Sequence, residues 1–482
     1  MPVYGRYFRA GEFGVLSLLT ITLTLFSIVL KFGLNQAFFR HYYETDDDGV
    51  RRRIVGSTLL FLLASALPLT ALLYALAPGL SALILTGNAA SPANAGLLRL
   101  VFYICFFEVI TLVPDSILRV KFKSAQYSTL NIVAFAVQVT VICYLVMAVD
   151  ASVQSVLQGR LIGAAFETVL FFWMVRRELS LRFSFAEVKG MLAFGAPLIF
   201  SQVAFQLFMM IDRFFLLHYA TRRELGAYAM ANTLVSAIGI LVTVPFGQVW
   251  TVMRFSVMNE KGAEEYYSRV LTYVVFVSMF LSLCVSAVAG DGLRLFATSG
   301  YWPAATIIPL LAMSAVFDGA SRVLNIGITL RKRTIYAPIV IVIALAVNIG
   351  LNFWLIPRYG GMGATLSTLA SYVVFCALRY GASNLFFKVR YEWGRIFTLF
   401  LVGGLLMSCF YVNDLLRGPS PGRTTLYLSI LTKTGLALLF PAVLFAVQFY
   451  DERERRRMAE TWEKFQGLIK RERMPKPADI EI

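Results

Sequence analysis

Two short stretches of this chain follow one pattern: RYFRAGEFG at residues 6–14 and HYATRRELG at residues 218–226. Each opens on a basic residue followed by tyrosine and closes on glutamate, one further residue and glycine. Similar pairs follow in the same order: Glu108 with Asp318, Lys121 with Arg331, Lys123 with Arg333 and, after a slip of one residue, Tyr127 with Tyr336. The ordered matches predict a duplicated membrane unit, an arrangement that places a substrate path between two lobes in many transporters.

The composition is that of a membrane protein along its whole length. Of the 482 residues, 58% are hydrophobic and 15% are charged, against roughly 25% charged in soluble domains. The mean hydropathy is +0.70. Only helices fit such apolar runs, because strands of a membrane barrel alternate polar and apolar residues. We therefore predict an all-α polytopic membrane protein.

A transmembrane helix needs about 20 mostly apolar residues. By this measure the sequence predicts about thirteen spans, at residues 13–35, 54–77, 97–118, 127–148, 152–176, 190–217, 225–253, 268–289, 304–329, 335–356, 362–387, 393–412 and 424–449.

Lysine and arginine are unequally shared between alternate loops. About twenty cations lie in one set of loops and about eight in the other, and the richer set is expected to be cytoplasmic. The richer set includes Arg51-Arg52-Arg53, Arg176-Arg177 and Arg331-Lys332-Arg333. Much of the net charge of +16 is therefore a topology signal, and no nucleic-acid partner is predicted.

This orientation places the N-terminus outside. In the second copy a full span, residues 190–217, precedes Glu224, whereas only eleven residues precede Glu12 in the first copy. A missing first helix would restore an inside N-terminus and an even number of about fourteen spans. We interpret this as a truncated reading frame or a protein that truly lacks the helix.

The spans 97–118 and 304–329 are six apart, so the two copies run in parallel. The predicted architecture is two helical lobes of about six helices each, the first helix missing, followed by two additional helices. The predicted domains are a first lobe at 1–177, a cytoplasmic connector at 178–189, a second lobe at 190–388, two transmembrane helices at 389–450 and a charged cytoplasmic tail at 451–482, which includes Met474-Pro475-Lys476-Pro477.

The charged side chains inside predicted spans include Glu108, Arg160, Glu167, Asp318, Arg322 and Arg379. A charge at the bilayer centre costs about 2.5–3.5 kcal/mol on insertion scales, so such residues face a partner or water. We predict that the three arginines face the gap between the lobes, where guanidinium groups suit phosphate oxygens.

The three acids among these residues have two open interpretations. Asp318 and Arg322 are four residues apart and can pair on one helix face. Arg160 and Glu167 are seven apart, too far for a close pair. The acids are therefore either coupling sites for a transported ion or structural partners.

The sequence contains none of the nucleotide-binding, metalloprotease or nucleophile-elbow motifs, and only two histidines. We expect no catalytic residue, no cofactor and no metal site.

The stretch from Asn348 to Leu369, NIGLNFWLIPRYGGMGATLSTL, places two asparagines before Ile-Pro, two glycines and Gly-Ala. It resembles a segment of polysaccharide transporters of the O-antigen flippase (Wzx) type, within the multidrug/oligosaccharidyl-lipid/polysaccharide exporter superfamily. The stretches 33–40 and 212–228 look like other parts of that family. Pro357 is expected to end a helix, Gly360 and Gly361 to permit a tight reversal, and Gly363-Ala364 to allow close packing of the next helix.

The resemblance implies a flippase of the bacterial inner membrane, with its C-terminus in the cytoplasm. Its substrate would be a polyprenyl-pyrophosphate-linked oligosaccharide used for O-antigen, capsule or exopolysaccharide. Glycosyltransferases and a polysaccharide polymerase are the protein partners to expect. Two alternatives remain at this point: a cation-coupled drug or metabolite antiporter of the same superfamily, and a membrane subunit of a polysaccharide synthase that transports nothing itself.

Overall fold

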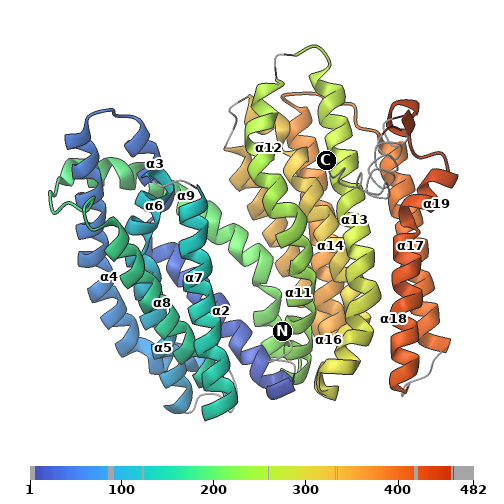
Figure 1. The fold of residues 1–482 in the computed structure, drawn as a ribbon, viewed down its shortest axis with the longest axis horizontal. Helices are drawn as coiled ribbons and strands as arrows, with labels where there is room; N and C mark the ends of the chain where they lie inside the picture. Colours follow the sequence, from blue (N-terminus) through green and yellow to red (C-terminus); the bar gives the residue numbers. More distant parts are fainter. Residues whose placement is uncertain are drawn as a thin grey trace, which may run out of the picture.

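A computed structural model describes residues 6–84, 92–121, 124–258, 260–331, 333, 335–416, 422–456 and 460. These residues form two helical bundles with a smaller helical group beside the second (Figure 1). Twelve helices in the described residues are long and apolar enough to cross a membrane, which confirms a polytopic all-α protein.

The first bundle contains α2 (Ala10–Leu30), α3 (Leu34–Tyr43), α4 (Asp48–Ile84), α5 (Pro92–Ile110), α6 (Leu112–Lys121), α7 (Ser124–Tyr144) and α8 (Val153–Val175). The second contains α10 (Asp212–Tyr219), α11 (Arg222–Ile238), α12 (Val244–Ser256), α13 (Ala263–Phe296), α14 (Ala304–Leu324), α15 (Ile326–Leu330) and α16 (Tyr336–Asn384), and α9 (Phe185–Met210) runs between the two. The group beside the second bundle is α17 (Trp393–Leu416), α18 (Arg423–Leu438) and α19 (Phe440–Ala446).

The 49-residue helix α16 is a hairpin. Gly360 has φ 51° and ψ −128°, which are not helical values. The Asn348 amide donates to the Ser371 hydroxyl at 3.1 Å, although a straight helix would separate residues 23 apart by about 35 Å. The two arms are the predicted spans 335–356 and 362–387, which explains twelve candidate helices where thirteen spans were predicted. Pro357 lies within the helix and does not end it, contrary to our expectation; the reversal comes at Gly360.

The two copies of the opening pattern pack against each other. A Cβ atom added to Gly226 would lie 1.6 Å from the Ala10 carbonyl oxygen, and one added to Gly14 would lie 3.1 Å from the Gly226 nitrogen. The Tyr301 hydroxyl also donates to the Phe8 carbonyl at 3.2 Å. The bundles are thus joined at the end where α2 begins, and in Figure 1 they lie farther apart toward the opposite end.

Helix α9 contacts both bundles. Near its start, Gly195 lies against the backbone of Gly33, where an added Cβ on Gly33 would lie 2.3 Å from the Gly195 oxygen. Near its end, the Phe208 ring packs on Tyr372 and Phe375 of α16, with ring centroids 5.1 and 5.2 Å apart. Because successive parts of one helix pack on different bundles, α9 physically couples their positions.

The helices α17–α19 are attached to the second bundle by charged groups. Lys433 of α18 pairs with Asp291 of α13 at 3.1 Å, and each side chain is only 2% exposed. At the start of the tail, Glu454 accepts hydrogen bonds from Arg395 and from the Tyr273 hydroxyl, both at 2.7 Å. Residues 452–456 are helical. Most of the predicted tail 451–482, with Met474-Pro475-Lys476-Pro477, lies outside the described residues.

Candidate functional site

A cavity of about 660 Å³ lies between the bundles. Helices α2, α7 and α8 line one side of it, and α10 and α11 contribute Arg213 and Thr233 from the other bundle. Most of its wall is apolar, with Phe13, Phe135 and Val139 as examples. Because both bundles contribute to its wall, this cavity can change shape when the bundles move relative to each other.

Two guanidinium groups from opposite bundles line this cavity. Arg160 of α8 donates to the Thr20 hydroxyl at 3.1 Å. Arg213 of α10 has a buried Nε without a hydrogen-bond partner. Among the described residues, neither arginine forms an ion pair with a carboxylate. Two cations that face a partly apolar cavity and form no ion pair favour binding of an anion.

The other two predicted arginines lie together in the second bundle. Arg322 pairs with Asp318 at 3.4 Å, which confirms that these two residues can pair. Arg379 donates to the carbonyl and hydroxyl oxygens of Ser321 at 2.9 and 3.1 Å, and its guanidinium carbon lies 4.1 Å from the centre of the Phe375 ring. Neither arginine lines the cavity that contains Arg160, so their part in a substrate path stays a prediction.

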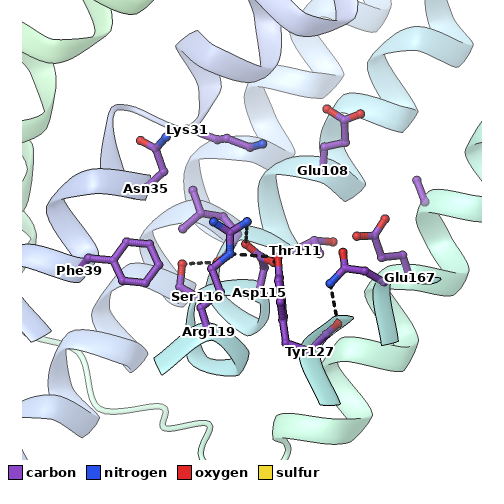
Figure 2. Close-up of a pocket in the computed structure, with 13 residues that line it drawn as sticks. Lys31, Asn35, Phe39, Glu108, Thr111, Asp115, Ser116, Arg119, Tyr127 and Glu167 are labelled. Atoms are coloured by element: carbon purple, nitrogen blue, oxygen red, sulfur yellow. Dashed lines mark hydrogen bonds and ion pairs between the residues drawn. The ribbon is translucent and has the colours of Figure 1, made fainter. Parts of the chain in front are cut away.

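The remaining predicted acids, Glu108 and Glu167, line a second cavity of about 390 Å³ inside the first bundle. Figure 2 shows them across from Lys31, with Asp115, Arg119 and Tyr127 on the cavity wall. Glu108 accepts a hydrogen bond from the Ser27 hydroxyl at 2.7 Å. This cavity is polar, unlike the one between the bundles.

Two residues that line these cavities, Arg213 and Lys31, are not among the site residues predicted from the sequence. Arg213 follows the buried Asp212, which accepts hydrogen bonds from the Tyr228 and Thr368 hydroxyls. Arg213 belongs to the family-like stretch 212–228, and a cation at the end of the predicted span 190–217 is itself a signal of a functional site. Lys31 lies within the predicted span 13–35, but near a span end a lysine usually indicates only a membrane boundary.

Comparison with known proteins decides the family. Residues 3–306 match the profile of the family described as polysaccharide biosynthesis protein. The chain belongs to this polysaccharide biosynthesis protein family. A search of curated proteins finds no match to it.

Solved structures with a similar fold come from the multidrug/oligosaccharidyl-lipid/polysaccharide exporter (MOP) superfamily. The lipid II flippase MurJ in an inward closed conformation matches with a TM-score of 0.70 and 15% identity, over 93% of this chain and 96% of MurJ. An inward-facing MATE multidrug resistance transporter matches with a TM-score of 0.67 and 13% identity, over 83% of this chain and 93% of the transporter. A MOP superfamily transporter from Pyrococcus furiosus matches with a TM-score of 0.51 and 14% identity, over 81% of this chain and 88% of the other.

At these identities the likeness establishes a shared fold. Together with the family, it confirms the resemblance to polysaccharide transporters of this superfamily. The polysaccharide biosynthesis protein is thus a multi-pass membrane protein whose fold is shared with solved transporters of this superfamily.

Proposed function

We propose that this polysaccharide biosynthesis protein moves a polyprenyl-pyrophosphate-linked oligosaccharide outward across the bacterial inner membrane by alternating access. The observation that carries the proposal is the pair Arg160 and Arg213, which face one cavity from opposite bundles. A diphosphate bound there would contact both bundles at once. Its binding would therefore depend on how the bundles are arranged, as a transported substrate requires.

The proposed site accommodates a molecule with a polar head and an apolar tail. The arginines provide the polar contacts, while Phe13, Phe135 and Val139 provide apolar wall. Helix α7 lies in the least buried of the candidate spans, Gln126–Val149, with 17% of its apolar window buried. The isoprenoid tail would remain in the bilayer beside this helix while the head group occupies the cavity.

The membrane potential would favour outward movement of the substrate. A diphosphate carries negative charge away from a negative cell interior, which is worth about 2.3 kcal/mol per elementary charge per 100 mV. The bundles are joined where α2 begins, next to the outer loops of the predicted topology, so the described conformation would open toward the cytoplasm. In this arrangement the cation-rich loops and the C-terminal tail lie inside the cell, where glycosyltransferases would supply the substrate; a polymerase would act on the product outside.

Arginine variants in a strain that depends on this gene for its surface glycan test the proposal. Arg160→Ala and Arg213→Ala are expected to abolish surface glycan while the protein remains inserted and abundant. Lysine at either position should restore export partly, because the charge remains but the bidentate guanidinium contact is lost. Arg379→Ala tests whether the site extends into the second bundle.

Arg358→Ala is the matched control. Arg358 donates to the Trp354 carbonyl of its own helix at 3.0 Å and lies outside the cavity, so its loss should leave export intact. Normal surface glycan in both Arg160→Ala and Arg213→Ala would contradict the proposal.

A further inference from the structure

The polar cavity of the first bundle lies beside the cavity between the bundles along the same two helices, α7 and α8. On α7, Asn131 lines the polar cavity and Phe135, one turn further on, lines the cavity between the bundles. On α8, Ala164 lines the polar cavity and Arg160, one turn earlier, lines the cavity between the bundles. Glu167 lies seven residues beyond Arg160, about 10 Å along the helix at 1.5 Å per residue. A head group whose diphosphate lay at Arg160 would therefore extend its sugars into the polar cavity.

Most donors on the polar cavity wall are already used within the protein. Arg119 pairs with Asp115 at 2.9 Å and also donates to the Tyr127 hydroxyl at 3.1 Å. That hydroxyl donates to Asp115 at 2.9 Å. The Asn131 amide nitrogen donates to the Tyr127 carbonyl at 2.9 Å, so the amide oxygen is directed away from that bond. Of the two charged donors that line this cavity, Arg119 is used in these bonds, and Lys31 remains available to a ligand.

Several acceptors, in contrast, are left unused. Among the described residues, Glu167 has no hydrogen bond or ion pair, and the Asn35 amide oxygen is buried without a partner. The Asn131 amide oxygen and the second oxygen of Glu108 add to them. The Asn35 oxygen is buried, whereas Glu108, Asn131 and Glu167 are half-buried and line the cavity. This wall therefore offers acceptors to a ligand that supplies several donors.

The charges on the wall add a selective element. Glu108, Asp115 and Glu167 provide three carboxylates against the two cations Lys31 and Arg119, a net charge of −1. A sugar carboxylate would be placed among acids and acceptors, whereas hydroxyl and ammonium groups would donate to them. The volume of 390 Å³ lies within the range of about 300–1,000 Å³ typical of small-molecule sites.

We infer that the polar cavity is the glycan subsite of the transporter and that it selects neutral or amino sugars against uronic acids. The inference rests on the proposed function, since it takes the diphosphate to lie at Arg160 and Arg213. Glu167, Asn131 and Asn35 would accept from sugar hydroxyls, and the carboxylates would reject an acidic sugar.

Free disaccharides that lack lipid and diphosphate test this subsite. The full chain in lipid nanodiscs is titrated by saturation-transfer NMR with three probes: an N-acetylglucosamine disaccharide, its de-N-acetylated ammonium form, and a disaccharide that contains a uronic acid. We expect the first two to bind and the third to bind at least about tenfold more weakly, equivalent to one 1.4 kcal/mol difference.

Two variants and one control separate the contributions. Glu167→Gln keeps an acceptor oxygen but removes a charge, so it should narrow the discrimination against the uronic probe several-fold while neutral binding changes little. Asn131→Leu removes an acceptor and should weaken neutral binding by about tenfold. Glu264→Gln removes a charge from an exposed position of α13 and should change neither. Equal binding of neutral and uronic probes, unchanged discrimination in Glu167→Gln, or no binding of any disaccharide would each overturn the inference.

Inorganic pyrophosphate, titrated separately, reports on the arginine pair. If wild-type protein binds pyrophosphate and Arg160→Ala does not, while no disaccharide binds, the glycan subsite fails and the proposed function stands. If the disaccharides bind selectively but pyrophosphate does not bind, the selective cavity stands and the proposed diphosphate site fails.

Discussion

Substitution of Gly226 by alanine should open the contact between the bundles. The added Cβ would lie 1.6 Å from the Ala10 oxygen and 2.3 Å from the Ala10 carbonyl carbon. Both atoms belong to the backbone and cannot rotate away, so α2 and α11 must separate. Overpacking of this kind costs about 1–3 kcal/mol or more. If the whole cost falls on the joined arrangement, its population relative to the open one decreases by roughly 5- to 150-fold.

Gly14→Ala provides a graded comparison at the repeat-related position. Its Cβ would lie 3.0 Å from a Leu225 side-chain carbon and 3.1 Å from the Gly226 nitrogen, a conflict that small shifts can relieve. We expect less than about 1 kcal/mol here. Gly350→Ala is the control, since a Cβ at this helical glycine meets no atom within 4 Å.

The rate of disulfide formation across the contact between α2 and α11 measures how often the two bundles are joined. A Cβ built on Gly11 lies 3.3 Å from the Arg222 Cβ, close to the roughly 3.5–4.5 Å found in disulfides. Gly11→Cys with Arg222→Cys, in a background where the five native cysteines are serine, should therefore cross-link readily under mild oxidation. The rate should decrease in the order wild type, Gly14→Ala, Gly226→Ala, with Gly350→Ala unchanged. Equal rates in all four, at equal abundance in the membrane, would refute the steric reasoning.

Three other predictions concern charge. Lys433→Met should destabilise the protein by about 3–5 kcal/mol because the buried Asp291 loses its ion pair with Lys433. Addition of Asp291→Leu should restore most of the loss, and thermal unfolding in detergent checks both variants. Burial opposes ionisation of Glu454, but the hydrogen bonds from Arg395 and Tyr273 outweigh it and lower the pKa of Glu454 below its ordinary 4.5. Docking of the tail is therefore complete above about pH 4.5 and is lost as the pH falls through the lowered pKa. Glu454→Gln should expose the tail to protease at about pH 7. A reporter fused after Val120 should report the cytoplasm, and periplasmic activity there would overturn the predicted orientation.

The helices could be predicted from the sequence because the physics is local. Long apolar runs without charge leave helices as the available structure, and the spans on both sides of Gly360 are present as predicted. The pairing of Asp318 with Arg322 followed from their spacing along one helix. Which side chains share a cavity did not follow, since that depends on contacts between distant segments. Arg160 meets Arg213 rather than Arg322 or Arg379, and Lys31 faces Glu108, because helices cross at angles that periodicity does not specify.

The crossing of α2 and α11 also has an evolutionary consequence. Gly14 and Gly226 hold equivalent places in the two copies, and each lies against the helix that carries the other. This is the geometry of an isologous interface, in which one surface patch meets itself across a two-fold axis. A single ancestral copy could have made the same contact as a homodimer, with one glycine serving both sides. After such a duplication each glycine could change by itself, and the distances of 1.6 and 3.1 Å show that the two sides are not equivalent. The predicted duplication would thus have turned a symmetric dimer contact into one whose halves can be adjusted separately.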